Sequence, residues 1–444
     1  MPTRSWTRAL ACIIAVTAFA TACPPGPNGG STTTTAVSTP RPTPPSPSMS
    51  FTSQRCASVR AAATTNPGRY SAGSPFRVPA ACAGLASDSG LWASRWFEAT
   101  AAPSATPSSR GRVATNFFDF STPTYEVSVH EPIQWVRVFA WDGTSSVPNG
   151  TLFPYSPEFL PSGSWVNGLY FFDSDAIYVV YDRRTGQEWR VWNAPYDGID
   201  LRYPNARCLT DASGRPTGFV IGRDLCVGGA YYAVDPDGSD PDASSTGIGG
   251  AVNQAIGKVF PLAGIATADE LIAGDVHHPL MMSMYKTMFG APVCPSGSTD
   301  ISGSGCGTFL FPASRVEHAS GPASCGVTMN IGDRATTLPQ GMWFALNLSD
   351  AEVEWWLDSR GYSGTKRATV TKLVRALREY GFMVGPTSCG GAGLALDGAI
   401  NPGTAFKWKN ELGIDPAAPS AKGLLDGLIA SPDNVVRLNP PAAS

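Results

Sequence analysis

The sequence predicts a mainly β protein, a β-sandwich or jelly-roll-like fold with a few peripheral helices. Glycine and proline are plentiful, at 47 and 39 residues, and the aromatic residues are common. Short apolar alternations recur between turn signals, whereas long helical patterns are few. This combination is typical of turn-rich β proteins and disfavours a helical bundle.

The N-terminus predicts a secretory signal peptide over residues 1–22. Arg4 and Arg8 precede an apolar run that is too short to span a bilayer, and the run ends in Ala20-Thr21-Ala22-Cys23. The last four residues look like a bacterial lipobox, with Ala20 where such boxes usually carry Leu. We therefore expect Cys23 to carry lipid and to be the only link to a membrane; the alternative is ordinary cleavage that leaves an unpaired Cys23.

Residues 23–50 are rich in Pro, Thr and Ser and nearly free of large apolar side chains. Such a segment cannot bury enough surface to offset its ordering entropy, so it predicts a lipid-anchored linker. We expect a single disulfide-braced domain over 51–444. The alternative is two domains divided near 235–250, a loop rich in Gly, Asp and Ser.

Ten cysteines are present, of which one leaves with the signal peptide and one is the lipid candidate. An even number of remaining cysteines in an exported chain predicts disulfides. The simplest pairing is sequential, although eight cysteines allow 105 connectivities. No spacing typical of a zinc site is found. The predicted pairs are Cys56–Cys82, Cys208–Cys226, Cys294–Cys306 and Cys325–Cys389.

The strands are expected where apolar and β-branched residues alternate or cluster between turns. One hairpin is the clearest element, because Gly186, near the end of the Asp182–Gly186 turn, can adopt the left-handed conformation. The expected strands are Tyr125–His130, Ile133–Trp141, Leu169–Phe172, Ala176–Tyr181, Glu188–Trp192, Gly218–Gly222, Gly229–Val234, His278–Tyr285, Thr308–Pro312 and Met342–Leu346.

Four helices are expected. Thr267 and Ser349 each begin a capping box, with a glutamate three residues later. The segment Thr365–Tyr380 has an apolar stripe at helical spacing and is followed by a terminating glycine. Ser420–Ala430 is the last candidate.

Several stretches resemble a family of exported, uncharacterised proteins, many of them from actinobacteria. They are Asp175–Trp192, Leu262–Leu280, Leu338–Met342 and Arg375–Val384. In this chain the Asp182–Gly186 turn lacks the Pro that family members usually carry there, and Pro279 stands where they usually have Ala. The resemblance runs from about residue 170 to 400 and implies a secreted β-sandwich without an established reaction.

The hairpin carries the first candidate site. Glu188, Arg190 and Trp192 share one face of a strand, and this mix suits a sugar, with an indole for the ring and charged groups for the hydroxyls. With Asp182 and Asp175 nearby, Glu188 and a second carboxylate would act in glycoside hydrolysis. The alternative is a solvated outer face carrying a Glu/Arg pair.

A histidine and a tyrosine form the second candidate site. His278 with Tyr285 would act as base and acid in β-elimination from a uronate. The resemblance places the family's histidine at 278 and so favours it over His277, which shares its strand face with Tyr285. The alternative for His278 is a buried, hydrogen-bonded core residue. Arg315 and His318 would line a cleft, or else belong to a solvated loop.

We expect no cofactor. Phosphate-binding, dinucleotide and zinc-protease signatures are lacking. The acidic turn at 235–240 is either a surface Ca²⁺ site or a plain Asx turn. The formal net charge is −3 and only 15% of residues are charged, so no basic surface for nucleic acid is predicted.

Together these features predict an exported surface lipoprotein, on the outer face of the cell membrane or in the cell wall, that acts on extracellular or cell-wall polysaccharide. If the protein is an enzyme, we expect a glycoside hydrolase or a polysaccharide lyase. The alternatives are a non-catalytic carbohydrate-binding or adhesion module and an envelope scaffold. The sequence leaves open whether the chain is an enzyme and which oligomeric state it adopts.

Overall fold

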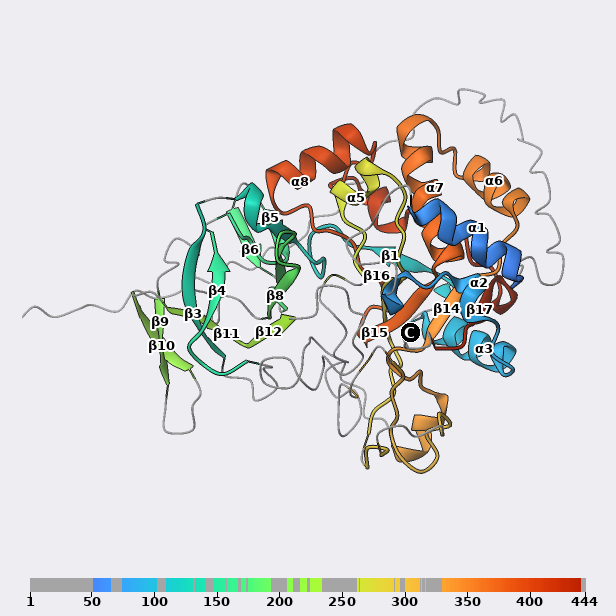
Figure 1. Cartoon of the computed structure of the whole chain (residues 1–444), viewed down its shortest axis with the longest axis horizontal. Helices are drawn as coiled ribbons and strands as arrows, with labels where there is room; N and C mark the ends of the chain where they lie inside the picture. Colours follow the sequence, from blue (N-terminus) through green and yellow to red (C-terminus); the bar gives the residue numbers. More distant parts are fainter. Residues whose placement is uncertain are drawn as a thin grey trace, which may run out of the picture. The chain divides into compact units, whose positions relative to one another are not determined.

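The computed structural model shows a mixed α/β fold rather than the predicted mainly β one (Figure 1). It describes residues 51–64, 74–101, 109–130, 132–140, 147–156, 158–166, 169–172, 175–192, 206–210, 216–221, 224–233, 262, 264–290, 292–295, 300–311, 313, 316 and 330–440. The predicted signal peptide and linker, with Cys23, lie outside these ranges. Among the described residues, no helix is both long and apolar enough to cross a membrane.

The described strands are short and form three mixed sheets and two two-stranded antiparallel ones. The strands are β1 Val113–Thr115, β2 Thr124–Glu126, β3 Gln134–Ala140, β4 Thr151–Tyr155, β5 Gly163–Val166, β6 Leu169–Phe172, β7 Tyr178–Asp182, β8 Gln187–Trp192, β9 Ala206–Thr210, β10 Pro216–Ile221, β11 Asp224–Val227, β12 Gly229–Ala233, β13 Leu280–Met284, β14 Trp343–Leu346, β15 Phe382–Thr387, β16 Ala392–Leu394 and β17 Val435–Arg437.

Three of the described α-helices precede β1, and the other four lie between β12 and β17. The α-helices are α1 Ser53–Thr64, α2 Ala80–Ala83, α3 Ser89–Ala99, α5 Ala268–Ala273, α6 Asp350–Ser359, α7 Gly364–Glu379 and α8 Pro402–Phe406. Single 3-10 turns are η1 Pro75–Arg77, η3 Val127–Val129, η6 Ile331–Thr336, η8 Pro419–Gly423 and η9 Pro432–Asn434, and η7 Lys407–Glu411 is a π-helical turn.

The largest core surrounds a six-stranded sheet in the order β1-β16-β13-β15-β14-β17. Alternation along β13 places Leu280, Met282 and Met284 on one face, where they pack in a cluster with side chains of α3, α6 and α7. Met281 faces the other way and packs against Phe76 and its neighbours. Both faces of the sheet are therefore buried, which explains why its strands are nearly all apolar.

A second core is shared by two smaller sheets, β12-β8-β7-β2 and β11-β3-β4. Val136 and Val138 of β3 join it from one sheet, and Trp189 and Val191 of β8 from the other. Trp189 and Val191 therefore alternate with the polar residues of β8 and face this second core.

The elements with the strongest local signals are confirmed. The predicted hairpin forms as β7 and β8, with Gly186 at a φ of 72°. Ser349 and Glu352 make both halves of the capping box at α6, and Thr365–Tyr380 is helical as α7. Thr267 caps α5 by accepting a hydrogen bond from the Glu270 N–H.

Three elements are corrected. The strand expected over Tyr125–His130 ends after Glu126 and continues as a 3-10 turn, and Thr308–Pro312 forms no strand in its described residues. Ser420–Ala430 is not an α-helix but a 3-10 turn followed by further turns. Gly427 has a φ of 77° there, which a right-handed helix cannot contain.

Two of the predicted disulfides are confirmed, Cys56–Cys82 and Cys294–Cys306. Cys226 and Cys389 are also disulfide-bonded. The side chains of Cys208 and Cys325 lie outside the described part of the chain, so the pairings Cys208–Cys226 and Cys325–Cys389 stay predictions.

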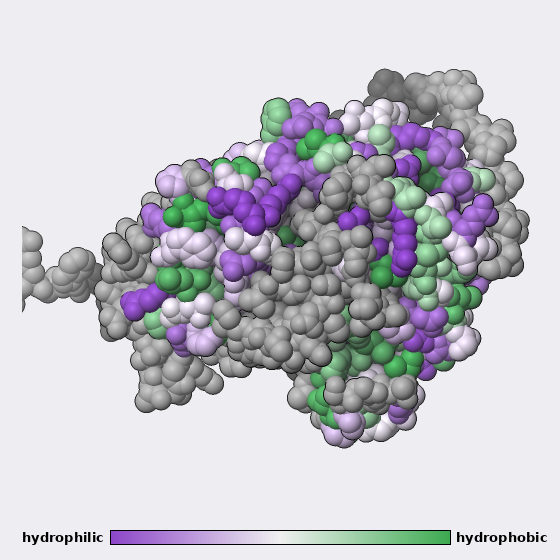
Figure 2. Space-filling view, viewed as in Figure 1, coloured by the Kyte–Doolittle hydropathy of each residue, from purple (hydrophilic) through white to green (hydrophobic). Residues whose placement is uncertain are grey.

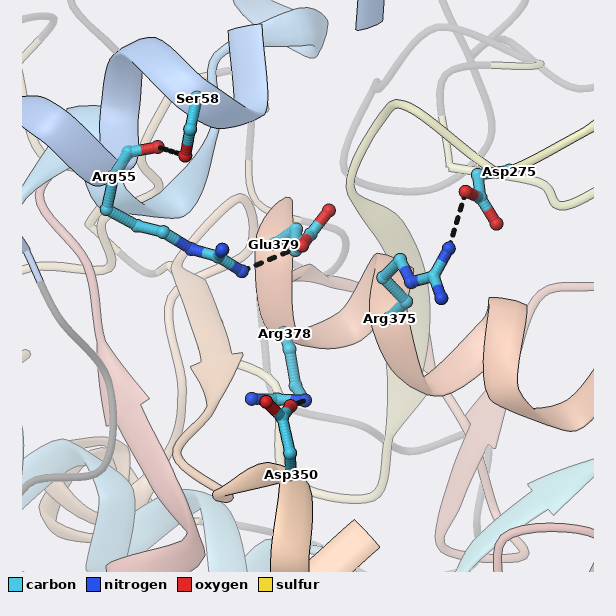
Figure 3. Close-up of polar contacts among 7 residues, drawn as sticks. All are labelled: Arg55, Ser58, Asp275, Asp350, Arg375, Arg378 and Glu379. Atoms are coloured by element: carbon cyan, nitrogen blue, oxygen red, sulfur yellow. Dashed lines mark hydrogen bonds and ion pairs between the residues drawn. The ribbon is translucent and has the colours of Figure 1, made fainter. Parts of the chain in front are cut away.

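The C-terminal part of α7 reaches three separate segments (Figure 3). Glu379 pairs with Arg55 of α1 at 2.8 Å. Arg378 pairs with Asp350 of α6 and Arg375 with Asp275, both at 2.6 Å. Each pair is partly exposed and contributes at most about 1 kcal/mol, so these contacts orient the segments more than they stabilise them.

The buried carboxyl group of Asp397 connects strand β2 with the start of helix α5. Its Oδ1 accepts hydrogen bonds from the backbone N–H and the hydroxyl of Thr124, at 3.1 and 2.9 Å. Its Oδ2 accepts one from the Ala268 N–H at 3.4 Å, at the start of α5. Strand β2 and helix α5 are therefore held at the same residue.

Helix α1 depends on its disulfide. It has almost no amphipathic character, and among its residues with described burial, Ser53 to Ala62, only Val59 is buried. We expect Cys56→Ser/Cys82→Ser to raise backbone amide hydrogen exchange across Ser53–Thr64 while the sheets stay protected, because the covalent link to α2 is lost. Cys294→Ser/Cys306→Ser is the matched control and should leave exchange in α1 unchanged; equal exchange in both variants would contradict this role.

The stability of the protein should depend on Asp397 near neutral pH. Burial raises the pKa of Asp397 to about 7, against an ordinary value of 3.8. Between these values the native carboxyl holds a proton that the unfolded chain has released, so the free energy of unfolding falls as pH rises through this window. We expect a loss on the order of 2 kcal/mol between about pH 5.5 and pH 8 from this group.

Denaturant unfolding of the wild type and of Asp397→Asn across this pH range checks the prediction. Asn keeps an acceptor for the Thr124 donors but does not titrate, so the variant's profile should be flatter. Parallel profiles would show that the pKa of Asp397 is not raised in the native protein.

Candidate functional site

The predicted hairpin face exists, but it is buried. Glu188, Arg190 and Trp192 lie on one side of β8, as expected from the register. Glu188 is only 4% exposed and Arg190 only 5%, and Trp192 is half-buried. Val179 and Tyr181, the cross-strand neighbours on this side, pack against Leu262 and Ile265. Neither the sugar-binding groove nor its alternative, a solvated outer face with a Glu/Arg pair, fits side chains this buried.

The two charged residues of this face differ in their surroundings. Glu188 Oε2 accepts a hydrogen bond from the Leu262 N–H at 3.2 Å. Burial lowers the pKa of Arg190 to about 10, while Tyr231 and Asp175 act in the opposite direction. Asp175 is thus close enough to affect Arg190, as predicted. Among the described residues, Arg190 Nε has no hydrogen-bond partner.

The two predicted catalytic carboxylates point to opposite faces of the sheet. Asp182 pairs in register with Gln187, whereas Glu188 pairs with Tyr181, and successive side chains on a strand alternate sides. Burial acts to raise the pKa of Asp182, but hydrogen bonds from Arg184 and its charge outweigh burial and hold the pKa below its usual value. Asp182 therefore shapes the turn, and it does not flank a substrate together with Glu188.

His278 is occupied at both ring nitrogens. Its Nδ1 lies 2.8 Å from the Pro279 carbonyl oxygen, which can only accept, so Nδ1 carries the proton. Its Nε2 lies 3.1 Å from Glu270 Oε2. His278 is thus the buried, hydrogen-bonded residue that was the alternative expectation.

His278 and Tyr285 do not form a pair. They flank β13 at opposite ends, and five strand residues alone span about 16 Å. The structure places a different tyrosine beside the neighbouring histidine: the rings of His277 and Tyr380 lie 5.8 Å apart. Both side chains are buried, so a polysaccharide chain cannot reach them. Spacing along the strand could not indicate Tyr380, because it lies about a hundred residues away.

The remaining predicted positions are not placed. Arg315, His318 and the acidic turn at 235–240 lie outside the described residues. Within the residues that are described, no three His, Cys, Asp or Glu side chains form a group that could hold a metal ion.

The exposed aromatic surface lies on β3 and β4 instead. Trp135, Arg137 and Phe139 alternate along β3 with the core residues Val136 and Val138, and Leu152 of β4 lies on the same face as Arg137; we call these four residues the aromatic sheet face. Trp135 is 51% exposed and Leu152 53%. In register, Leu152 lies directly opposite Arg137. Figure 2 shows hydrophobic side chains scattered among hydrophilic ones on the side of the molecule in view.

The aromatic sheet face is partly pre-ordered. The Trp135 ring meets the Trp189 ring edge-on at 5.7 Å, and the Arg137 guanidinium lies 5.9 Å from the centre of the Phe139 ring. The result is the combination expected on β8, an indole beside a guanidinium, but in solvent. The sequence already contains this pattern: within Ile133–Trp141, Trp135, Arg137 and Phe139 alternate with Val136 and Val138.

A second exposed aromatic pair lies on the β5–β6 hairpin. Trp165 and Tyr170 are directly opposite each other, with ring centres 5.3 Å apart. The Trp165 indole N–H donates to the Ile400 carbonyl at 3.3 Å, which fixes the ring while leaving it 47% exposed.

No protein-family model, curated protein or solved structure matches the chain. The resemblance to exported actinobacterial proteins therefore stays a prediction, and the site is interpreted from its own geometry.

Proposed function

We propose that this protein is an exported surface protein that binds extracellular or cell-wall polysaccharide through the aromatic sheet face. The observation that carries the proposal is the exposure of Trp135 on the same face as Arg137 and Leu152. An exposed indole can cover the C–H face of a sugar ring, and a neighbouring guanidinium can donate to its hydroxyls. Most of this chemistry is fixed before a ligand arrives, which lowers the entropic cost of binding.

The proposal is one of binding and not of cleavage. The carboxylates expected to hydrolyse a glycoside, Glu188 and Asp182, face opposite sides of their sheet, and His278 is separated from Tyr285 by a strand. Neither arrangement supports a hydrolase or a lyase at those residues.

The exported location belongs to the same proposal. The Cys56–Cys82 and Cys294–Cys306 disulfides are stable in oxidising compartments, which supports export. We also propose that Cys23 carries lipid. We further propose that the two smaller sheets form a sandwich, which is supported by the hydrophobic core that they share.

Binding should require the exposed indole. We expect Trp135→Ala to weaken retention on immobilised polysaccharide at least about tenfold, because one stacking surface is removed. Affinity electrophoresis against a panel of neutral and acidic polysaccharides measures this. Arg137→Gln should weaken binding less, since it removes donors and keeps the aromatic surface.

The matched control is Phe406→Ala, which removes an exposed aromatic side chain from α8. It should leave retention unchanged. Equal retention of the wild type and Trp135→Ala on every polysaccharide that binds would refute the aromatic sheet face as the site. Release of reducing ends during the same incubation would show that the protein cleaves the polysaccharide and does not only bind it.

A further inference from the structure

A pocket of about 460 Å³ lies against the edge of the six-stranded sheet, away from every residue discussed above as a site. Its walls come from β1, β16, the residues that follow α3, and the turns after Pro419. Its polar lining includes Ser109, Arg112, Arg360, Ser420, Lys422 and Asp426. The volume is within the range of small-molecule sites, about 300–1,000 Å³.

Three cationic side chains and one carboxylate line this pocket, so positive charge is in excess by two. Arg112, Arg360 and Lys422 are exposed, and none of them forms an ion pair with a carboxylate within the described residues. Arg110 is a direct contrast: two residues from Arg112, it pairs with Glu98 at 2.9 Å. The cations of the pocket are therefore available to a ligand.

The wall formed by residues 421–426 is held rigidly by side chains. Tyr362 donates its hydroxyl to the Leu424 carbonyl at 2.9 Å, and the Trp356 indole N–H donates to the Asp426 carbonyl at 3.0 Å. Arg360 Nη2 donates to the Gly423 carbonyl at 3.0 Å, which positions its guanidinium at the pocket rim. Because the segment is not an α-helix, these carbonyls can accept side-chain donors, and the Gly423 carbonyl also accepts from the Asp426 N–H at 3.1 Å.

We infer that this pocket binds the carboxylate or phosphate group of a hydroxylated ligand, an acidic sugar. Guanidinium and ammonium groups form strong, charge-assisted hydrogen bonds to both anions. Asp426 would repel a bare anion but accepts hydrogen bonds from sugar hydroxyls, so it favours an anion that carries them. The sugar part of this assignment rests on the proposed function, whereas the anion part rests on the pocket alone.

Isothermal titration of the full-length protein at low ionic strength tests the inference. The probes are glucose 1-phosphate, glucuronate, inorganic phosphate and uncharged glucose. We expect the two acidic sugars to bind, glucose to bind at least tenfold more weakly, and raising salt from about 20 to about 200 mM to weaken the acidic sugars several-fold. The stronger of the two acidic sugars identifies the anion.

Variants then assign the binding to the pocket. Arg112→Gln/Lys422→Gln should lose at least tenfold in affinity for the acidic sugars. Arg60→Gln, which removes an exposed cation of α1, should lose nothing. Asp426→Asn should bind inorganic phosphate several-fold more tightly than the wild type, a gain that a misfolded protein would not show.

The inference is overturned if neither acidic sugar binds, or if the double variant binds both as the wild type does. Inorganic phosphate binding that equals the sugars and is unaffected by Asp426→Asn would overturn the sugar part. Trp135→Ala serves as a cross-check, because it should leave titration at the pocket unchanged. A failure of the proposed function is thus distinguished from a failure of the pocket.

Discussion

The arrangement of the chain around the large sheet depends on one buried carboxyl group. Residues 395–399 continue from β16 and make backbone hydrogen bonds to Met281, Ala266, Thr122 and Phe117 in turn. At the centre of this crossing, Asp397 accepts from Thr124 on one side and from the N–H of Ala268 on the other. A side chain without two acceptor oxygens would leave buried donors unpaired there, at a cost of about 1–3 kcal/mol each.

This crossing also explains why the polar face of β8 is buried. Leu262 and Ile265 precede α5, whose first turn is held at Asp397, and they cover Val179 and Tyr181. Glu188 and Arg190 are the neighbours of those two residues and are covered with them. A charged strand face is therefore part of an internal contact, and the exposed indole and guanidinium are found on β3 instead.

The sequence was informative wherever the cause of a structure lies within about fifteen residues. The β7–β8 hairpin, the capping box at Ser349, the stripe of α7 and the short Cys294–Cys306 loop all depend on neighbours along the chain. Whether the Glu188 and Arg190 face of β8 is buried depends on residues some seventy positions later, and alternation along a strand does not contain that information. The turns after Pro419 carry apolar residues at helical spacing, which predicts a helix, but the positive φ of Gly427 is incompatible with one.

The Cys56–Cys82 disulfide has a mechanical consequence. Any pull on the chain before residue 51 reaches the fold through the first turn of α1, a helix in which Val59 is the one buried residue over 53–62. The crosslink lies only three residues from the start of that helix and leads directly to α2. Tension is thus carried by a covalent bond, and unravelling under load stops at Cys56 before it can reach the sheets.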